Sequence, residues 1–392
     1  MKLESKIRNL AKHQRNGAMK RGSHLVASIL VLALVSGFAI RSVSDLGVAS
    51  PRNMLRIHIT DYGSSVAAAS ETGPVDSVTP VVTNLPDGGL QTSYHLPDGQ
   101  SIIVNTPPRG FDPLTASNSR LQEFNFPVRP SDSLALQDWI RVMSAFGSDD
   151  APSGSLPVAT NSTATKYSVI YGPWAGYSSG SNNTQSNTFV AVKGDVTVPS
   201  ASTCGSTNNI AAWVGLGGTT SATNNLVQQG IECGNSNLGS GSAWRPWTEF
   251  ADTANPVNFC GYTSWTFAAG DVIYQNMGYE ASSNLANFFL EDITTGVAHS
   301  CSASPPSGWS YDDNTADWIM EAPTGSAVNF GTVPFSDANT ELDSTGTWVT
   351  MGSQATTKWI DGSSSAVNCI APQGIGSDSQ SFSDKWIQSS CS

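Results

Sequence analysis

The sequence predicts an all-β domain over residues 166–392, built as a sandwich or barrel of antiparallel sheets. Short apolar and β-branched runs alternate there with turns rich in Gly, Ser, Asn and Thr, and no long amphipathic helical pattern is present. Many short strands with turn-rich spacers are typical of such folds, and about 225 residues suffice for one domain. The expected strands are Phe189–Val198, Ala211–Leu216, Leu226–Glu232, Asp271–Glu280, Asn287–Ile293, Asp317–Glu321, Gly331–Phe335 and Thr356–Asp361.

The N-terminal part of the chain differs from this domain in amino-acid composition. Residues 1–24 carry seven Lys or Arg and one acid, and the apolar run Leu25–Ile40 follows. This run is shorter than the roughly 20 residues that a membrane span needs. A basic stretch before a short apolar core is typical of a secretory signal. We therefore expect residues 1–40 to be a signal peptide and the protein to be secreted; a signal anchor that tethers it to the membrane is the alternative.

Residues 41–165 are expected to form a pro-region and a linker. Met54–Thr60 and Ser101–Asn105 are possible strands, and Ser133–Phe146 has a helical pattern. Residues 147–165 are rich in Ser, Pro, Asp, Ala and Thr, a composition typical of exposed segments that proteases cut. Such a pro-region could block the cleft of the following domain. The alternative is an independent N-terminal domain that is never removed.

Charge is concentrated in the C-terminal part. From Lys166 onward there are five Lys or Arg and eighteen Asp or Glu, which accounts for nearly all of the formal charge of −12. Such a surface disfavours nucleic acid and anionic membranes as partners. As the pH falls towards the carboxyl pKa of about 4, the net charge shrinks, so the domain should tolerate acid.

The six cysteines also lie in this part, at positions 204, 233, 260, 301, 369 and 391. An even number of cysteines behind an export signal favours disulfides, although six cysteines allow fifteen pairings. No C-x-x-C pair occurs, and His299 is the single histidine after Lys166. We therefore expect no metal site and no cofactor.

Elimination narrows the possible chemistry. His299 has no Gly-x-Ser-x-Gly context that would support a serine hydrolase, and no pair of Asp-Thr/Ser-Gly loops is present. The remaining possibility is a site formed by carboxylate and amide side chains on β-strands. With a period of two residues, Asp317 shares a strand face with Glu321, Gln228 with Glu232, and Trp247 with Glu249. Taken alone, each of these patterns is explained more simply by solvent-facing polar residues on an exposed strand face.

Together and in this order, segments between Tyr167 and Asp361 resemble the glutamic peptidase (eqolisin) family. The matching segments are Trp174–Tyr177, Phe189–Pro199, Trp213–Gly218, Leu226–Gly230, Trp247–Glu249, Asp271–Ile273, Glu291–Gly296, Ala316–Glu321 and Phe330–Val333. The resemblance implies a lectin-like (concanavalin A-like) sandwich of two antiparallel sheets. It also implies an acid endopeptidase that acts on protein or peptide substrates, and we expect a monomer.

The resemblance places the catalytic roles on Gln228 and Glu321. Glu321 would take a proton from the attacking water, and Gln228 would stabilise the tetrahedral intermediate. Gly230, two residues from Gln228, would leave room for a ligand.

Supporting positions in the cleft are Trp213, Gly217, Trp247, Glu249 and Asp317. Two of them depart from the family pattern, because Gly217 replaces an Asp of some members and Asp317 replaces a Glu. The residues from about 362 onward look like a C-terminal extension. Two other functions stay open: a carbohydrate-binding lectin-like domain, and a glycoside hydrolase that pairs Glu321 with Glu249 or Asp317.

Overall fold

The computed structural model describes residues 80–96, 99–147, 167–180, 189–200, 204–205, 207–219, 225–234, 242–251, 257–258, 260, 264–311, 313–342 and 347–390. All of these belong to the unit Thr60–Ser392. The predicted signal segment, the possible strand Met54–Thr60 and nearly all of the linker lie outside them. Within the described ranges, no helix is both long and apolar enough to cross a membrane.

Eight strands form the first sheet, which we call sheet I. Their order is β10-β9-β8-β7-β14-β5-β17-β4, and only the β17–β4 pair is parallel. The strands are β10 (Val257–Asn258), β9 (Trp244–Phe250), β8 (Leu226–Cys233), β7 (Ile210–Gly217), β14 (Ala316–Glu321), β5 (Trp174–Ser179), β17 (Thr356–Ser364) and β4 (Tyr167–Gly172).

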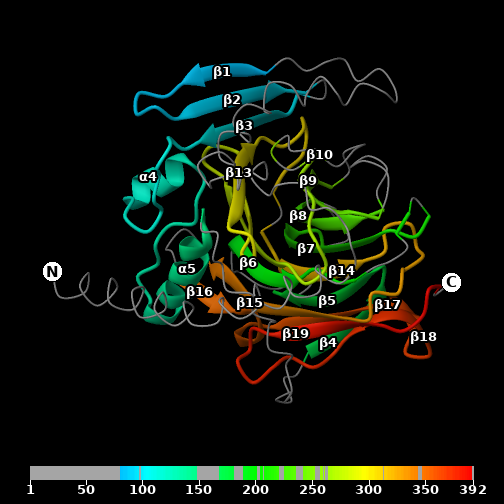
Figure 1. Cartoon of the computed structure of the whole chain (residues 1–392). Helices are drawn as coiled ribbons and strands as arrows, with labels where there is room; N and C mark the ends of the chain where they lie inside the picture. The colour runs from blue at the N-terminus through cyan, green and yellow to red at the C-terminus, as the bar shows by residue number, and fades with distance from the viewer. Residues whose placement is uncertain are drawn as a thin grey trace, which may run out of the picture. The chain divides into compact units, whose positions relative to one another are not determined.

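The second sheet, sheet II, is antiparallel throughout. Its order is β1-β2-β3-β13-β12-β11-β6-β15-β19-β18, with β16 at the end of β15 (Figure 1). The strands are β1 (Val81–Asn84), β2 (Leu90–His95), β3 (Ser101–Thr106), β13 (Val297–Ala303), β12 (Leu285–Asp292), β11 (Val272–Glu280), β6 (Phe189–Thr197), β15 (Thr332–Leu342), β16 (Thr347–Thr350), β19 (Phe382–Trp386) and β18 (Val367–Pro372).

One strand belongs to both sheets. The first half of β17 pairs with β5 in sheet I, and its second half pairs with β18 in sheet II. Because β18 and β19 lie between β17 and β15, the residues from about 362 onward are an integral part of sheet II.

The two sheets pack face to face around a shared core. Alternate side chains of each strand enter this core, among them Val192 and Phe288 from sheet II and Val214 and Trp318 from sheet I. The indole N–H of Trp318 donates to the Lys193 carbonyl across the interface, at 2.7 Å. This arrangement confirms the predicted all-β sandwich of two antiparallel sheets.

The N-terminal part adds two helices, α4 (Asn118–Glu123) and α5 (Ser133–Ala145). α5 matches the helix predicted for Ser133–Phe146, and β3 matches the possible strand Ser101–Asn105. Each strand predicted after residue 166 is also present, with ends that differ by a few residues for most and by more for β15, which runs on to Leu342.

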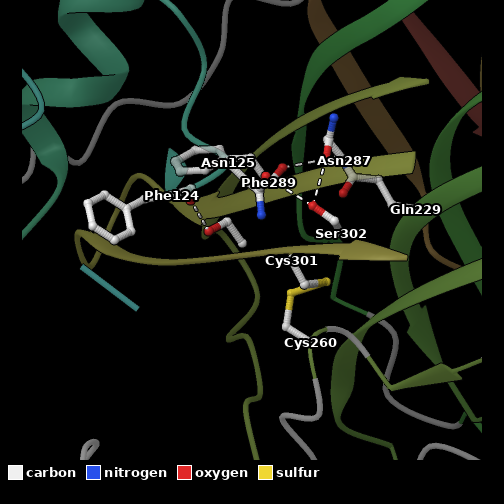
Figure 2. The surroundings of a disulfide bond; sticks show 9 residues. Phe124, Asn125, Gln229, Cys260, Asn287, Phe289, Cys301 and Ser302 are labelled. Atoms are coloured by element: carbon white, nitrogen blue, oxygen red, sulfur yellow. Dashed lines mark hydrogen bonds between the residues drawn. A yellow bond between two sulfur atoms is a disulfide. The ribbon is translucent and has the colours of Figure 1, made fainter. Parts of the chain in front are cut away.

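Disulfides are present as expected. Cys204 is bonded to Cys233, Cys260 is bonded to Cys301, and Cys369 is also disulfide-bonded. The first bond ties β8 to the segment before β7. The second ties the segment that follows β10 of sheet I to β13 of sheet II (Figure 2).

Candidate active site

A stripe of apolar side chains crosses the outer face of sheet I, the face that points away from sheet II. The strand registers align Ile170, Trp359, Ile319, Trp213 and Trp247 in one line from β4 to β9. These five residues pack as one cluster, and we call them the apolar stripe. Trp213 and Ile319 are fully buried within it.

Two glycines leave space for Trp213 in this stripe. A Cβ on Gly230 would lie 2.6 Å from the Trp213 Cβ and 2.4 Å from the Ala212 carbonyl oxygen. A Cβ on Gly215 would lie 2.9 Å from the far edge of the same indole. The Cβ position of Gly230 is therefore occupied by Trp213 and the Ala212 carbonyl, so this glycine lets β7 approach closely. That it leaves room for a ligand beside Gln228 stays a prediction.

Polar residues flank the apolar stripe on both sides. One row runs through Asp317, Gly215, Gln228 and Glu249. The other row runs through Trp174, Glu321, Ala211, Glu232 and Arg245. The predicted residues therefore share one face of one sheet. Gln228 and Glu321 lie in different rows, on strands separated by β7, with Trp213 between the rows.

Gln228 is held by a carboxylate. Its side-chain N–H donates to Glu249 Oε2 at 2.7 Å, and the side chain is 5% exposed. Its amide oxygen is buried and has no hydrogen-bond partner among the described residues. This amide thus has an acceptor oxygen that no described residue uses, and its NH₂ group has a second N–H in addition to the one that Glu249 binds.

Glu321 is surrounded by two tryptophans and two carboxylates. The Trp213 indole N–H donates to Glu321 Oε2 at 3.1 Å, and Trp174, whose ring lies 5.1 Å from that of Trp213, also donates to the carboxylate. Burial, together with the smaller effect of the charges of Glu249 and Glu232, raises the pKa of Glu321 to about 8, although the hydrogen bonds from the two tryptophans oppose this rise. Glu249 is therefore the link between Gln228, which donates to it, and Glu321, whose pKa its charge raises.

The other two predicted cleft positions have backbone or buried roles. Asp317 is fully buried, and the Thr315 hydroxyl donates to its Oδ2 at 3.4 Å. Gly217 ends β7 with a φ of 85°, in the left-handed region that favours glycine. The Gly217 carbonyl lies 3.2 Å from the same Thr315 hydroxyl, whose single proton is shared between these two acceptors. The hydroxyl of Thr315 thus joins these two positions at the end of the row that contains Gln228.

The sequence did not identify two of the residues around Glu321. Trp174 lies opposite Glu321 only because β5 pairs with β14, and nothing in the order of the residues shows this register. The two-residue period of the strand placed Glu232 on the same face as Gln228, but it did not show that Glu232 acts on Glu321. The Asn209 amide donates to the Glu232 carboxylate at 2.7 Å. His299 lies on β13, where its ring contacts that of Trp265 at 4.5 Å.

Comparison with known proteins adds a family match. The model of the peptidase A4 family matches residues 172–374, which is more than half of the chain. Among solved structures, scytalido-glutamic peptidase with a peptide-based transition state analog is similar, with 21% identity over 55% of this chain and 98% of that chain and a TM-score of 0.42. Aspergilloglutamic peptidase from Aspergillus niger is 22% identical over 46% of this chain and 99% of that chain, with a TM-score of 0.37. A search of curated proteins found no match.

We expect Gly230→Ala to reduce both stability and activity, because the new methyl group would displace Trp213 and with it the hydrogen bond to Glu321. Overpacking of this kind costs about 1–3 kcal/mol, which is measurable by denaturant unfolding. Gly172→Ala is the matched control, because a Cβ there meets nothing within 4 Å. Equal stability of the two variants would contradict the close packing of Trp213 over Gly230.

We expect Glu321→Gln to raise the melting temperature relative to the parent at high pH but not at low pH. A carboxyl group whose pKa is higher in the folded state than the unfolded value of about 4.3 loses folding stability as the pH rises from there to about 8. The neutral amide avoids this loss, so the difference should grow between about pH 4 and 8. Calorimetry across this range, with the exposed Glu280→Gln as a control, checks the sign. A difference that is constant with pH would contradict the raised pKa.

Proposed function

Because the chain belongs to the peptidase A4 family, we propose that it is a secreted acid endopeptidase whose active site is the outer face of sheet I. Protein or peptide chains are its substrates, Glu321 is the general base, and Gln228 stabilises the tetrahedral intermediate. One observation carries the assignment of the residues. Glu249 accepts a hydrogen bond from Gln228, and its charge raises the pKa of Glu321, so the amide and the carboxyl group belong to one electrostatic site.

The reaction needs no covalent intermediate. The Glu321 carboxylate removes a proton from a water molecule, and the water oxygen attacks the scissile carbonyl. The Gln228 amide oxygen accepts the other hydrogen bond of that water, and its second N–H donates to the developing oxyanion. Glu321 then returns its proton to the leaving amine. Trp213 and Trp174 hold the carboxylate in place through both steps.

An acidic working range is part of this proposal, because the sandwich is poor in Lys and Arg and loses net charge as the pH falls. A carboxyl group with a pKa of about 8 is mostly protonated in acid, which opposes its role as a base. Protonation of Glu249 and Glu232 removes two causes of the raised pKa. A bound substrate and its water replace part of the lost solvation. Both changes return the pKa of Glu321 towards its ordinary range.

Secretion and a monomeric state complete the proposal. The disulfides Cys204–Cys233 and Cys260–Cys301 support passage through an oxidising compartment. The family match favours a peptidase over the carbohydrate-binding and glycoside-hydrolase alternatives.

We expect Glu321→Gln to abolish casein digestion between about pH 2 and 7, because an amide cannot accept the proton of the water. Gln228→Ala should lower kcat by about 10²–10³ through loss of one oxyanion donor. The exposed Glu280→Gln should retain full activity.

Asp317→Asn is the discriminating variant, because Asp317 is a second acid on the same face, in the row of Gln228. Activity that survives Glu321→Gln and is lost in Asp317→Asn would transfer the role of the base to Asp317. Activity that survives in both would show that the base lies elsewhere.

We expect Glu249→Gln to move the acidic limb of the pH profile of kcat/KM to lower pH. In the pH range where Glu249 is ionised in the free enzyme, the substitution removes the charge that raises the pKa of Glu321, so the Glu321 carboxylate persists to lower pH. The profile of kcat/KM reports the free enzyme and is the measurement of choice. An unchanged limb, with kcat reduced, would mean that Glu249 only positions Gln228.

A further inference from the structure

The described part of the expected pro-region, residues 80–96 and 99–147, extends sheet II through β1, β2 and β3 and covers its outer face with α4 and α5. That face lies on the opposite side of the sandwich from the candidate active site. We propose that this segment is a permanent subunit, which stays bound to the sandwich when the connection through residues 148–166 is cut. Three independent kinds of contact support this: strand pairing, a shared apolar core, and a buried network of charges.

Strand pairing makes the segment part of sheet II. β3 pairs with β13 through Ile103 opposite Ser302 and Ile102 opposite Ala303, and the Ser304 N–H donates to the Ser101 carbonyl at 2.9 Å. Ile102 and Val104 are buried in the core between the sheets. Without the segment, β13 would present an open strand edge to solvent, an arrangement that promotes aggregation.

The helices of the segment share an apolar core with the outer face of sheet II. This core contains Leu121, Phe124, Phe126, Trp139, Val142, Met143 and Ala145 of the segment and Val272, Tyr274, Phe289 and Ile293 of the sandwich. The rings of Phe126 and Phe289 lie 5.0 Å apart. Each side of this core is apolar, so separation would expose both sides to water.

Hydrogen bonds fix the chain between the two helices. The Ser300 hydroxyl donates to the Phe124 carbonyl at 2.6 Å, and the Ser302 hydroxyl contacts the Asn125 side-chain oxygen at 3.0 Å (Figure 2). Asn125 has a φ of 55°, so the chain turns sharply there and presents its polar groups to β13. At the end of the segment, the Gly147 N–H donates to the Gly296 carbonyl at 2.8 Å.

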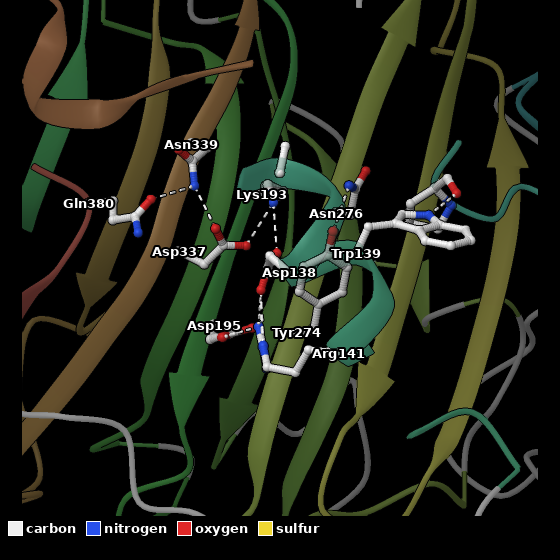
Figure 3. Close-up of polar contacts among 12 residues, drawn as sticks. Asp138, Trp139, Arg141, Lys193, Asp195, Tyr274, Asn276, Asp337, Asn339 and Gln380 are labelled. Carbon is white, nitrogen blue, oxygen red and sulfur yellow. Dashed lines mark hydrogen bonds and ion pairs between the residues drawn. The ribbon is translucent and has the colours of Figure 1, made fainter. Parts of the chain in front are cut away.

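Buried charges alternate across the interface (Figure 3). Lys193 of β6 bridges Asp138 of α5 and Asp337 of β15, each at 2.8 Å. Arg141 of α5 bonds Asp195 of β6 at 2.7 Å and Asp138 at 2.6 Å. Lys193 and Asp195 are 5% and 1% exposed, respectively. Substitution of Arg141 and Asp138 with the segment still docked would leave Asp195 without Arg141 and Lys193 without one of its two carboxylates, which is costly for buried charges.

The same network predicts that mild acid does not release the segment. Burial raises the pKa of Asp195 to about 6, although the charge of Arg141 opposes this, so this group favours docking as the pH falls towards about 4. Asp138 behaves oppositely. Burial raises its pKa, but the hydrogen bond with Asp337 and the charges of Lys193 and Arg141 together hold it well below its ordinary value.

Asp138 therefore supports docking until the pH falls below about 4. Asp337 and Glu291, which face the same charges from β15 and β12, have raised pKa values and act in the direction of Asp195. The segment should therefore bind the sandwich most strongly in mild acid, at a pH between the ordinary carboxyl pKa and the pKa of Asp195.

The segment also contacts β9 of sheet I at the end of the sandwich core. Gln100 and Ile102 line a small cavity of about 10 Å³ together with Thr248, Glu249 and Phe250 of β9. A volume of this size holds about one water molecule. If the proposed function holds, the segment supports the strand whose Glu249 binds Gln228.

The test uses the folded full chain with a recognition sequence for a specific protease inserted between residues 148 and 166. After cleavage, we expect the two pieces to elute together in gel filtration at micromolar concentration, at pH 7 and more firmly at about pH 5. Arg141→Ala with Asp138→Asn should speed dissociation of the cut segment at least about tenfold. Arg109→Ala, at an exposed position of the same segment, is the matched control and should change nothing.

Separation of the pieces on gel filtration, with residues 167–392 still folded by near-ultraviolet circular dichroism, would overturn the proposal. Faster dissociation at about pH 5 than at pH 7 would overturn the role given to Asp195. Both measurements are independent of peptidase activity, so they test the subunit whether or not the proposed function is correct.

Discussion

The position of Trp213 at the centre of sheet I is the constraint on which the candidate site depends. The edge of its indole lies against Gly215, its Cβ lies against Gly230, and its indole N–H reaches Glu321 in the adjacent row. A buried indole N–H needs an acceptor, and a desolvated carboxylate needs a donor. Each group therefore stabilises the other in a place where neither would be stable alone.

This arrangement explains why the pKa of Glu321 is raised. The apolar stripe excludes water between two polar rows, which strengthens every charge interaction beside it. Glu321 consequently responds to Glu249 and Glu232, and its pKa reflects burial more than any single partner. A carboxyl group with these surroundings changes its protonation when solvent, substrate or a neighbouring charge changes. That property is typical of functional sites.

The two outer faces of the sandwich differ in how their charged residues are arranged. The outer face of sheet I keeps its titratable groups around Trp213, where chemistry is proposed. The outer face of sheet II pairs its charges, Lys193 with Asp138 and Asp337, and Asp195 with Arg141, across an interface with the N-terminal segment. The base-poor sandwich thus places one of its few lysines at a buried position where it binds two carboxylates. The acidity read from composition is not spread evenly but is partly neutralised at this interface.

The sequence alone determined the all-β class, the positions of most strands and the face shared by Asp317 and Glu321, because these depend on a two-residue period and on local turn signals. It also singled out Gln228, Glu249 and Trp213 through the order of the motifs. Only the tertiary structure decided that Trp174 lies opposite Glu321, that Trp213 packs against Gly230, and that α5 supplies Arg141 to Asp195. These three contacts join strands or helices far apart in the chain. Which strands become neighbours, and in what register, is determined by the packing of the whole sandwich and not by any local pattern.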